Sequence, residues 1–99
     1  MASHKDFADY VVEQLRDAGS VYARRMFGEY GLYCDGVFFA LICDDQFFVK
    51  RTPQGEAAFP HLPKVPPYKG ARDYIQVEDV DDRQTMTALA QITCQALKN

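Results

Sequence analysis

Two turn signals divide a strongly apolar segment, residues 24–50, and this pattern constrains the fold more than any other feature of the sequence. Seven of these 27 residues are aromatic. Asp35-Gly36 is a strong signal for a two-residue hairpin, because a type I′ turn requires positive φ at both central positions. Asp44-Asp45 is a weaker signal for a second turn. The segment is therefore predicted to form an antiparallel β-meander at the core of the protein.

The residues before the meander predict one helix and one strand. Apolar side chains recur at helical spacing from Phe7 to Ala18, and Gly19 follows as a natural stop. We expect a helix over residues 5–18 and a strand over residues 21–26.

The residues after the meander predict two further helices and one strand. Thr52-Pro53 suits an N-cap followed by proline at the first helical position, so we expect a short helix that ends near Phe59. Residues 60–72 contain four prolines and predict an irregular connection, and residues 74–77 predict a last strand. Apolar residues at helical spacing predict a terminal helix: Met86, Leu89, Ala90, Thr93 and Leu97. The expected fold class is α+β in one domain, residues 1–99.

Composition and charge exclude some classes of protein. A hydrophobic fraction of 47% argues against global disorder, and a net charge of −3 argues against a generic nucleic-acid binder. The charge is uneven, because residues 24–72 hold seven basic and five acidic side chains while the two flanks hold four and nine. This distribution leaves two readings of the middle segment, a solvated surface or a basic binding face.

The sequence shows no signal peptide and no apolar run long enough to span a membrane, so we expect a cytoplasmic protein. Cys34, Cys43 and Cys94 are odd in number and lack metal-site spacing, which indicates small buried side chains. No phosphate-binding loop and no nucleophile beside His4 or His61 is apparent. We therefore expect no cofactor, no metal and no catalytic residues.

If both turns contain two residues, period-two alternation sorts the meander into two faces, and both are apolar. One face carries Tyr30, Leu32, Cys34, Val37, Phe39, Leu41, Cys43 and Phe48. The other carries Tyr33, Phe38, Ala40, Ile42, Phe47 and Val49. Such a sheet needs a cover on each side. The aromatic face of Tyr33, Phe38 and Phe47 is then covered by the protein's own helices and loop, shared with a second copy, or open to a small molecule.

Several short motifs in this segment resemble those of one protein family, the amino-terminal domain of TfoX/Sxy proteins. They are Arg25-Met26-Phe27-Gly28, Tyr30-Gly31-Leu32-Tyr33, Asp35-Gly36, Phe39-Ala40-Leu41, Asp45 and Phe48-Val49-Lys50. One departure lies at the entry to the last strand, where Arg72-Asp73-Tyr74-Ile75 keeps only the tyrosine of a longer family element. The longer members carry a carboxy-terminal domain that this chain does not include, so the resemblance implies a short, stand-alone member.

The resemblance implies a bacterial α+β domain similar to secretion-chaperone-like folds. It also implies a part in the regulation of transcription and DNA-uptake competence, in which longer relatives act with the cyclic-AMP receptor protein. Our leading hypothesis is a non-enzymatic regulatory module, a homodimer, that contacts a transcription regulator or another protein. Direct nucleic-acid binding and small-molecule binding on the aromatic face are the alternatives. The candidate interaction residues are Arg24, Arg25, Tyr33, Phe38, Phe47, Lys50, Lys69 and Arg72.

Overall fold

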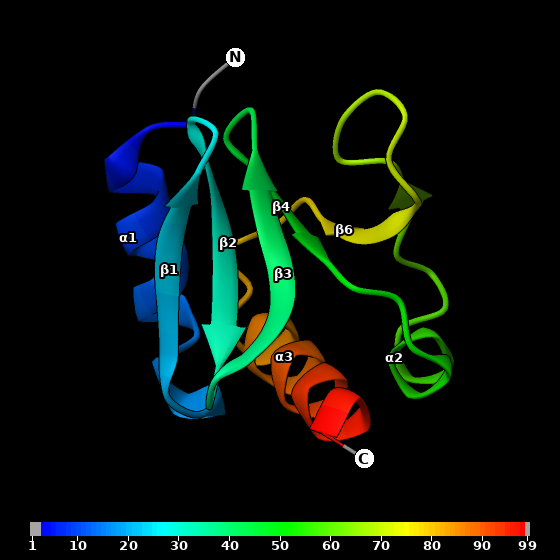
Figure 1. Ribbon diagram of the computed structural model, residues 1–99. Helices are drawn as coiled ribbons and strands as arrows, with labels where there is room; N and C mark the ends of the chain where they lie inside the picture. The colour runs from blue at the N-terminus through cyan, green and yellow to red at the C-terminus, as the bar shows by residue number, and fades with distance from the viewer. Residues whose placement is uncertain (1–2, 99) are drawn as a thin grey trace.

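A computed structural model describes residues 3–98 and confirms the α+β class (Figure 1). Its elements along the chain are α1 (Lys5–Gln14), the 3₁₀ turn η1 (Arg16–Ala18), β1 (Val21–Met26), β2 (Glu29–Cys34), β3 (Val37–Cys43), β4 (Gln46–Val49), α2 (Pro53–Ala58), β5 (Lys64–Val65), β6 (Tyr74–Val77) and α3 (Arg83–Lys98). The six strands form one antiparallel sheet in the order β1-β2-β3-β4-β6-β5.

Three two-residue turns with positive φ connect the first four strands. Asp35 and Gly36 have φ of 51° and 84°, and Asp44 and Asp45 have φ of 53° and 54°. Both predicted turns are therefore confirmed. The third turn joins β1 to β2 through Phe27-Gly28, with φ of 52° and 81°, and the sequence reasoning did not identify it as a turn.

Two expected elements differ from the structure. The first helix ends at Gln14 instead of residue 18, because Leu15 leaves helical geometry and the chain tightens into η1. This tighter turn keeps Leu15 fully buried while Ala18 packs against the core. The proline-rich connection was expected to hold no regular element, but Lys64–Val65 pairs with the edge of β6. By contrast, Thr52 caps α2 as predicted, since its hydroxyl accepts a hydrogen bond from the Gly55 amide at 2.9 Å.

A β-bulge in β3 overturns half of the predicted face assignment. Tyr33 lies opposite Phe38 as expected, but Leu32 lies opposite Ala40, so Phe39 is an extra residue on β3. Phe39 and Ala40 are consequently both buried on the same side. Beyond the bulge every side chain of β3 takes the face opposite to the predicted one.

The same inversion applies to β4, because the Asp44-Asp45 turn pairs Ile42 with Phe47 and Leu41 with Phe48, as predicted for a two-residue turn. Phe47 therefore lies in the main core, 1% exposed, and its expected place on the open face is wrong. Cys34 and Cys43, expected on one face, belong to different clusters.

All the helices lie on one side of the sheet. The main core combines α1 and α3 residues with one sheet face, and α2 packs beside α3. In Figure 1, α1 and α3 lie behind the sheet, and no helix covers the face turned toward the viewer. That face, called here the open face, is covered only in part, by the connection between β5 and β6.

Candidate functional site

The open face is built from side chains that alternate with the core residues along each strand. Residues paired across the strands share a face, so the register defines two of its rows. One row is Tyr22, Tyr33 and Phe38, and the next is Arg24, Gly31, Leu41, Phe48 and Gln76. The end of the face nearest β6 forms a small second core, in which Leu41, Cys43 and Phe48 are buried under Phe38, Val65 and Tyr74.

Three aromatic rings form a ladder across β1, β2 and β3. The Tyr22 and Tyr33 rings stack with centroids 5.2 Å apart, and the Tyr33 and Phe38 rings are tilted at 5.5 Å. Two cations lie over this ladder. The Arg24 guanidinium is 6.0 Å from the centre of Tyr33, and the Lys50 ammonium is 4.6 Å from the centre of Phe38. The four predicted residues Arg24, Tyr33, Phe38 and Lys50 therefore come together, and cation–π attraction orients both cations on the open face.

Gly31 makes the close packing of this face possible. A Cβ at this position would lie 3.0 Å from Cε of Met26 and 3.1 Å from Cε1 of Phe38. Because Gly31 carries no side chain, Met26 from β1 and Phe38 from β3 meet over β2. The result is a continuous apolar layer across three strands.

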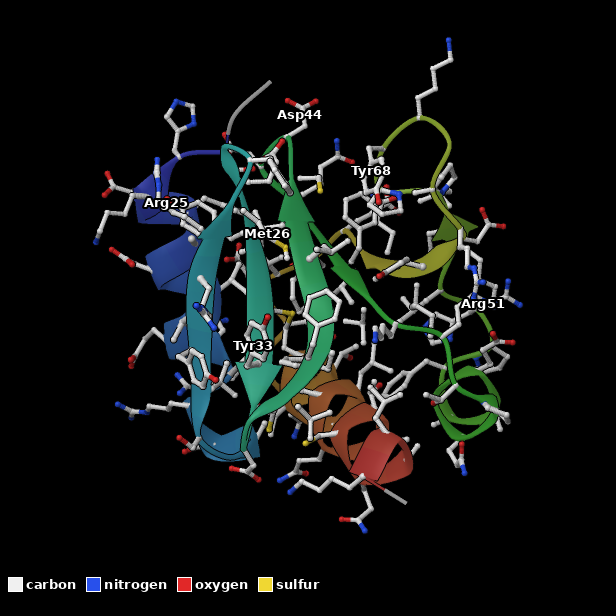
Figure 2. All side chains as sticks on the ribbon, viewed as in Figure 1. Arg25, Met26, Tyr33, Asp44, Arg51 and Tyr68 are labelled. Carbon is white, nitrogen blue, oxygen red and sulfur yellow. The ribbon has the colours of Figure 1, made fainter. Side chains whose placement is uncertain are left out.

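An apolar hollow of about 720 Å³ lies between the β1–β2 turn and the β5–β6 connection. Its lining residues are Met26, Phe27, Glu29, Phe38, Leu41, Cys43, Asp44, Pro67, Tyr68 and Tyr74. Leu41 and Cys43 form a buried floor, and burial raises the pKa of the Cys43 thiol to about 11. Figure 2 shows Met26 and Tyr68 on the two sides of this region. The volume is in the range of small-ligand and side-chain pockets, about 300–1,000 Å³.

A second, basic hollow of about 680 Å³ borders the apolar one. It is lined by Lys50, Arg51, Glu56, Arg72, Asp73 and Tyr74, so the two hollows share Tyr74. Arg51 is held in an ion pair with Glu56 at 2.5 Å. The other two cations of the hollow, Lys50 and Arg72, form no ion pair within residues 3–98.

The remaining predicted residues are scattered. Arg25 points to the helix side of the sheet, where its guanidinium lies 5.4 Å from the ring centre of Tyr30. This agrees with the expectation that neighbouring strand residues separate to opposite faces. Lys69 is exposed in the connection that leads to β6, away from the aromatic ladder. Phe47 is in the core, as described above. The open face thus unites Arg24, Tyr33, Phe38, Lys50 and Arg72.

Phe27 is a site residue that the sequence reasoning missed. Its side chain is fully exposed, although its backbone has a φ of 52°, a left-handed conformation that a bulky non-glycine residue rarely adopts. Such strain costs about 1–3 kcal/mol and persists only where the surrounding structure enforces it. A signal was available in the sequence, because the aromatic residue directly precedes Gly28 between two strand patterns.

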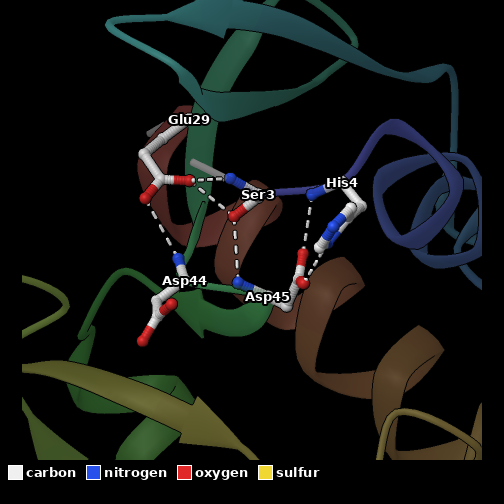
Figure 3. Close-up of polar contacts among 5 residues, drawn as sticks. All are labelled: Ser3, His4, Glu29, Asp44 and Asp45. Carbon is white, nitrogen blue, oxygen red and sulfur yellow. Dashed lines mark hydrogen bonds and ion pairs between the residues drawn. The ribbon is translucent and has the colours of Figure 1, made fainter. Parts of the chain in front are cut away.

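A polar cluster around Ser3 holds the Phe27 turn in place (Figure 3). The Ser3 amide donates to Oε1 of Glu29 at 2.8 Å and to the Gly28 carbonyl at 3.3 Å, and the Ser3 hydroxyl also donates to Glu29. The second Glu29 oxygen accepts from the Asp44 amide at 3.0 Å. Ser3 therefore ties the chain before α1 to both turns at this end of the sheet.

His4 extends this cluster to Asp45. The His4 amide donates to Oδ1 of Asp45 at 2.8 Å, and its Nδ1 lies 2.6 Å from Oδ2. These bonds raise the pKa of His4 and lower the pKa of Asp45. Ser3, His4 and Asp45 are the residue types of a hydrolase triad, but the Ser3 hydroxyl bonds to Glu29 and to the Asp45 amide. The cluster is therefore an anchor for the two turns and lacks the nucleophile–base contact that a triad requires.

Two cysteines lie together on the opposite side of the sheet. Ligand atoms of Cys34, Cys94 and Asp35 are within 4.8 Å of one another. The Cys94 thiol donates to the Cys34 carbonyl at 3.3 Å, and burial raises the pKa of the Cys34 thiol to about 12. Asp35 is already occupied by the Lys98 ammonium at 2.9 Å and by the Ser20 amide. Cys34 and Cys94 are therefore part of the buried core, and Asp35 is part of the β2–β3 turn.

The resemblance drawn from the sequence is borne out by comparison with a family profile. The TfoX N-terminal domain profile matches residues 13–97. The chain belongs to the TfoX N-terminal domain family. A relative from Spirochaeta aurantia, named as an uncharacterized 12.7 kDa protein in the trpE 5′ region, is 35% identical over 98 residues. The match covers 98% of this TfoX-type chain and 85% of the relative. Within residues 3–98, none of the helices has the length and hydropathy to span a membrane.

Proposed function

We propose that this TfoX-type domain is a non-enzymatic, regulatory protein-binding module whose open sheet face contacts its partner. The main support is that all helices lie on one face and leave an aromatic, cation-bearing surface on the other. Exposed apolar surface of this kind generally marks an interaction site. Membership of the TfoX family supports a transcription regulator as the partner.

The charges of the open face support a partner of opposite sign. On the helix side several cations are paired within the chain, as in Lys5–Asp9, Arg16–Glu13 and Lys98–Asp35, while Arg25 lies over the Tyr30 ring. On the open face, Arg24 and Lys50 lie over aromatic rings and form no ion pair among residues 3–98. A partner carboxylate could approach either cation without displacing an internal carboxylate.

The same charges favour protein over nucleic acid as the partner. Acidic residues line both hollows, namely Glu29 and Asp44 in the apolar one and Glu56 and Asp73 in the basic one. A polyphosphate chain crossing this surface would meet these carboxylates. Nucleic-acid affinity depends on many neutralised phosphates, and an overall charge of −3 works against it.

Affinity capture with matched variants tests the proposal. Tagged wild-type protein, Arg24→Glu, Tyr33→Ala and Arg16→Glu are incubated with an extract of the source bacterium, and retained proteins are identified by mass spectrometry. Arg16→Glu is the control, because it makes the same charge change on the helix side, where Arg16 is 64% exposed.

We expect a transcription regulator among the proteins that wild type and Arg16→Glu retain and that Arg24→Glu and Tyr33→Ala lose. The purified protein should then bind directly in calorimetry with the same ranking of variants. Retention that is equal for all four proteins would count against the open face as the binding surface. Light scattering tests the homodimer as the alternative occupant, and a dimer abolished by Arg24→Glu would replace the partner with a second copy.

A further inference from the structure

The two hollows of the open face together have the form of a site for an extended segment. We infer that they accept one acidic peptide segment of the partner, with a bulky apolar side chain between Phe27 and Tyr68 and a carboxylate beside Lys50 and Arg72. The inference rests on the proposed function and specifies the chemistry of its partner.

The apolar end of the site has a buried base and exposed edges. Leu41 and Cys43 are buried at its base, whereas Phe27 is fully exposed and Tyr68 is 60% exposed at its edges. A hollow with an apolar floor and two exposed aromatic residues in its lining is the kind of pocket in which interface anchor residues bury. An apolar side chain that enters this pocket would cover the floor and both aromatic rings.

Phe27 provides independent support for an occupant. A strained turn position is normally taken by glycine, asparagine or aspartate, which tolerate positive φ. Here a phenylalanine takes it, with φ 52° and a side chain that is fully solvent-exposed. The Ser3–Glu29 cluster holds this turn in place. The ring gains no burial among residues 3–98 in return for this strain, so the turn holds an apolar side chain where a second molecule can contact it.

The charges give the bound segment a direction. Glu29 and Asp44 lie at the end of the apolar hollow formed by the turns, and the Glu29 carboxylate is occupied by Ser3 and the Asp44 amide. At the other end, Tyr74 joins the apolar hollow to the basic one, where Lys50 and Arg72 form no ion pair with the rest of residues 3–98. The described lining of the first end carries acids and no cation, whereas the second carries three cations against Glu56 and Asp73, so a single carboxylate is favoured at the second end.

These observations favour a peptide over the other occupants. A second copy related by two-fold symmetry would bring two sets of unpaired cations together, which like-charge repulsion disfavours. A nucleic acid would place phosphates against the acidic end of the site. An acidic segment with an apolar anchor satisfies both ends at once.

Nuclear magnetic resonance with model peptides tests the inference. The probes are blocked peptides in which two leucines precede two glutamates, with spacers of one to four glycine or serine residues. Control peptides replace the glutamates by lysine or the leucines by serine. On addition to isotope-labelled protein, at least one spacer length should give saturable shifts in β3 and residues 66–74, while α1 stays unchanged. Both control peptides should bind at least about tenfold more weakly, as expected for the loss of a charge-assisted bond or a buried anchor.

Variants of the protein make the test specific. Phe27→Asn should weaken peptide binding at least about tenfold and raise the denaturant midpoint, because asparagine tolerates the left-handed turn. Loss of binding then cannot be ascribed to unfolding. Arg72→Glu should weaken binding of the glutamate peptide but not of its glutamine counterpart. Arg16→Glu should leave both affinities unchanged.

Three results would overturn the inference: no saturable shift with any spacer, equal binding of the lysine peptide, or tighter binding of a ten-nucleotide oligothymidine to the same residues. The captured partner separates this inference from the proposed function. Retention by Phe27→Asn combined with loss by Arg24→Glu would reject the peptide site and keep the protein-binding face. Retention by both variants would reject both.

Discussion

The two faces of one sheet differ in how they are covered, although both are apolar. The face against α1 and α3 holds the main core, in which Phe39 is fully buried. The other face holds a smaller cluster, which is covered by Phe38, Val65 and Tyr74 and bordered by Pro67 and Tyr68 of the β5–β6 connection. Phe38 and Phe39 are neighbours in sequence yet belong to these two environments. The difference shows that apolar composition alone does not decide which part of a strand supports folding and which remains available for contact.

The cations of the two faces differ in their partners. On the helix side Lys98 is paired with Asp35 and Arg16 with Glu13, and the strand cation Arg25 lies over the ring of Tyr30. Those over the aromatic ladder, Arg24 and Lys50, make cation–π contacts instead. Surface ion pairs contribute little to stability, with a median of about 0–1 kcal/mol. The ion pairs therefore contribute little to folding, and under the proposed function their main consequence is that Arg24 and Lys50 remain accessible to a partner's carboxylates.

Alanine substitution of the neighbouring phenylalanines gives the largest expected effect. Phe39→Ala should lower the free energy of unfolding by about 3–5 kcal/mol, because it removes a fully buried ring from the main core. Phe38→Ala should cost about 1–2 kcal/mol, since the half-buried ring covers only the smaller cluster. Urea denaturation followed by circular dichroism measures both values.

Equal losses for the two variants would contradict the division of the sheet into a folding face and an available face. Phe48→Ala is a useful third variant, because Phe48 lies on the open side but is 3% exposed. An intermediate loss is expected, since the ring is buried under Val65 and Tyr74 rather than under a helix.

Much of this fold could be predicted from the sequence because the turns have strong local signatures. Asp35-Gly36 set the pairing of β2 with β3 next to the turn, and Asp44-Asp45 set the pairing of β3 with β4. The bulge at Phe39 has no such signature, because inserting one residue changes only which apolar side chains share a face. Which apolar side chains face the helices depends on how the strands pack against α1 and α3, and this tertiary packing leaves no local signal in the sequence.

The site was predictable to the extent that it depends on the part of the β2–β3 hairpin nearest its turn. Tyr33 and Phe38 lie before the bulge, and their predicted shared face is confirmed. Phe47 lies after it, and its predicted face is wrong. Tyr68 could not be placed, because a proline-rich connection has no periodicity to relate it to the sheet. Phe27 was missed because the strand expected over residues 21–26 ends just before it and no turn was assigned to Phe27-Gly28.

The rates at which the buried thiols react show how readily each face of the sheet opens to solvent. Burial raises the pKa of Cys34 to about 12 and of Cys43 to about 11, so at pH 8 both should react with iodoacetamide at least about a hundredfold more slowly than in the unfolded chain. Cys43 should react before Cys34, because local opening of the β5–β6 connection requires less disruption than separation of α3 from the sheet. Mass spectrometry of timed samples, with and without urea, measures the order.

Faster alkylation of Cys34 than of Cys43 would mean that the helix side of the sheet opens more readily than the open face. Serine replacements at the two positions assign each modified peptide, since the third thiol, Cys94, is buried beside Cys34.

A methyl group at Gly31 tests the packing of the open face with a smaller effect. Gly31→Ala would place its Cβ about 3 Å from the ends of Met26 and Phe38, which must shift by a few tenths of an ångström. The crowding opposes the entropic gain of removing a strand glycine, so the stability should change by less than about 1 kcal/mol. Methyl and aromatic resonances of Met26 and Phe38 should move nonetheless. Unchanged resonances would show that the two side chains do not meet over β2.

The smallest effect is a pH dependence at the junction between the two faces, where the chain before α1 bonds to the turn between β3 and β4. Hydrogen bonding to Asp45 raises the pKa of His4 above its ordinary value of 6.5, and the His4 bonds lower the pKa of Asp45 below 3.8. Protonated His4 thus contributes fully below pH 6.5, and its contribution is lost as the pH rises through the raised pKa. The Asp45 contribution is present above about 3.8 and is lost as the pH falls through the lowered pKa.

The attachment of the chain before α1 should consequently be strongest between about pH 4 and 6.5. Titration of the His4 ring, followed by nuclear magnetic resonance, measures the His4 pKa. Asp45→Asn should return this pKa toward 6.5. Asp44→Asn is the matched control, because Asp44 shares the turn but contacts Glu29 through its amide instead of contacting His4. An equal shift in both variants would mean that His4 senses the general charge of the turn. The N-terminal cluster would then anchor the Phe27 turn through Ser3 alone.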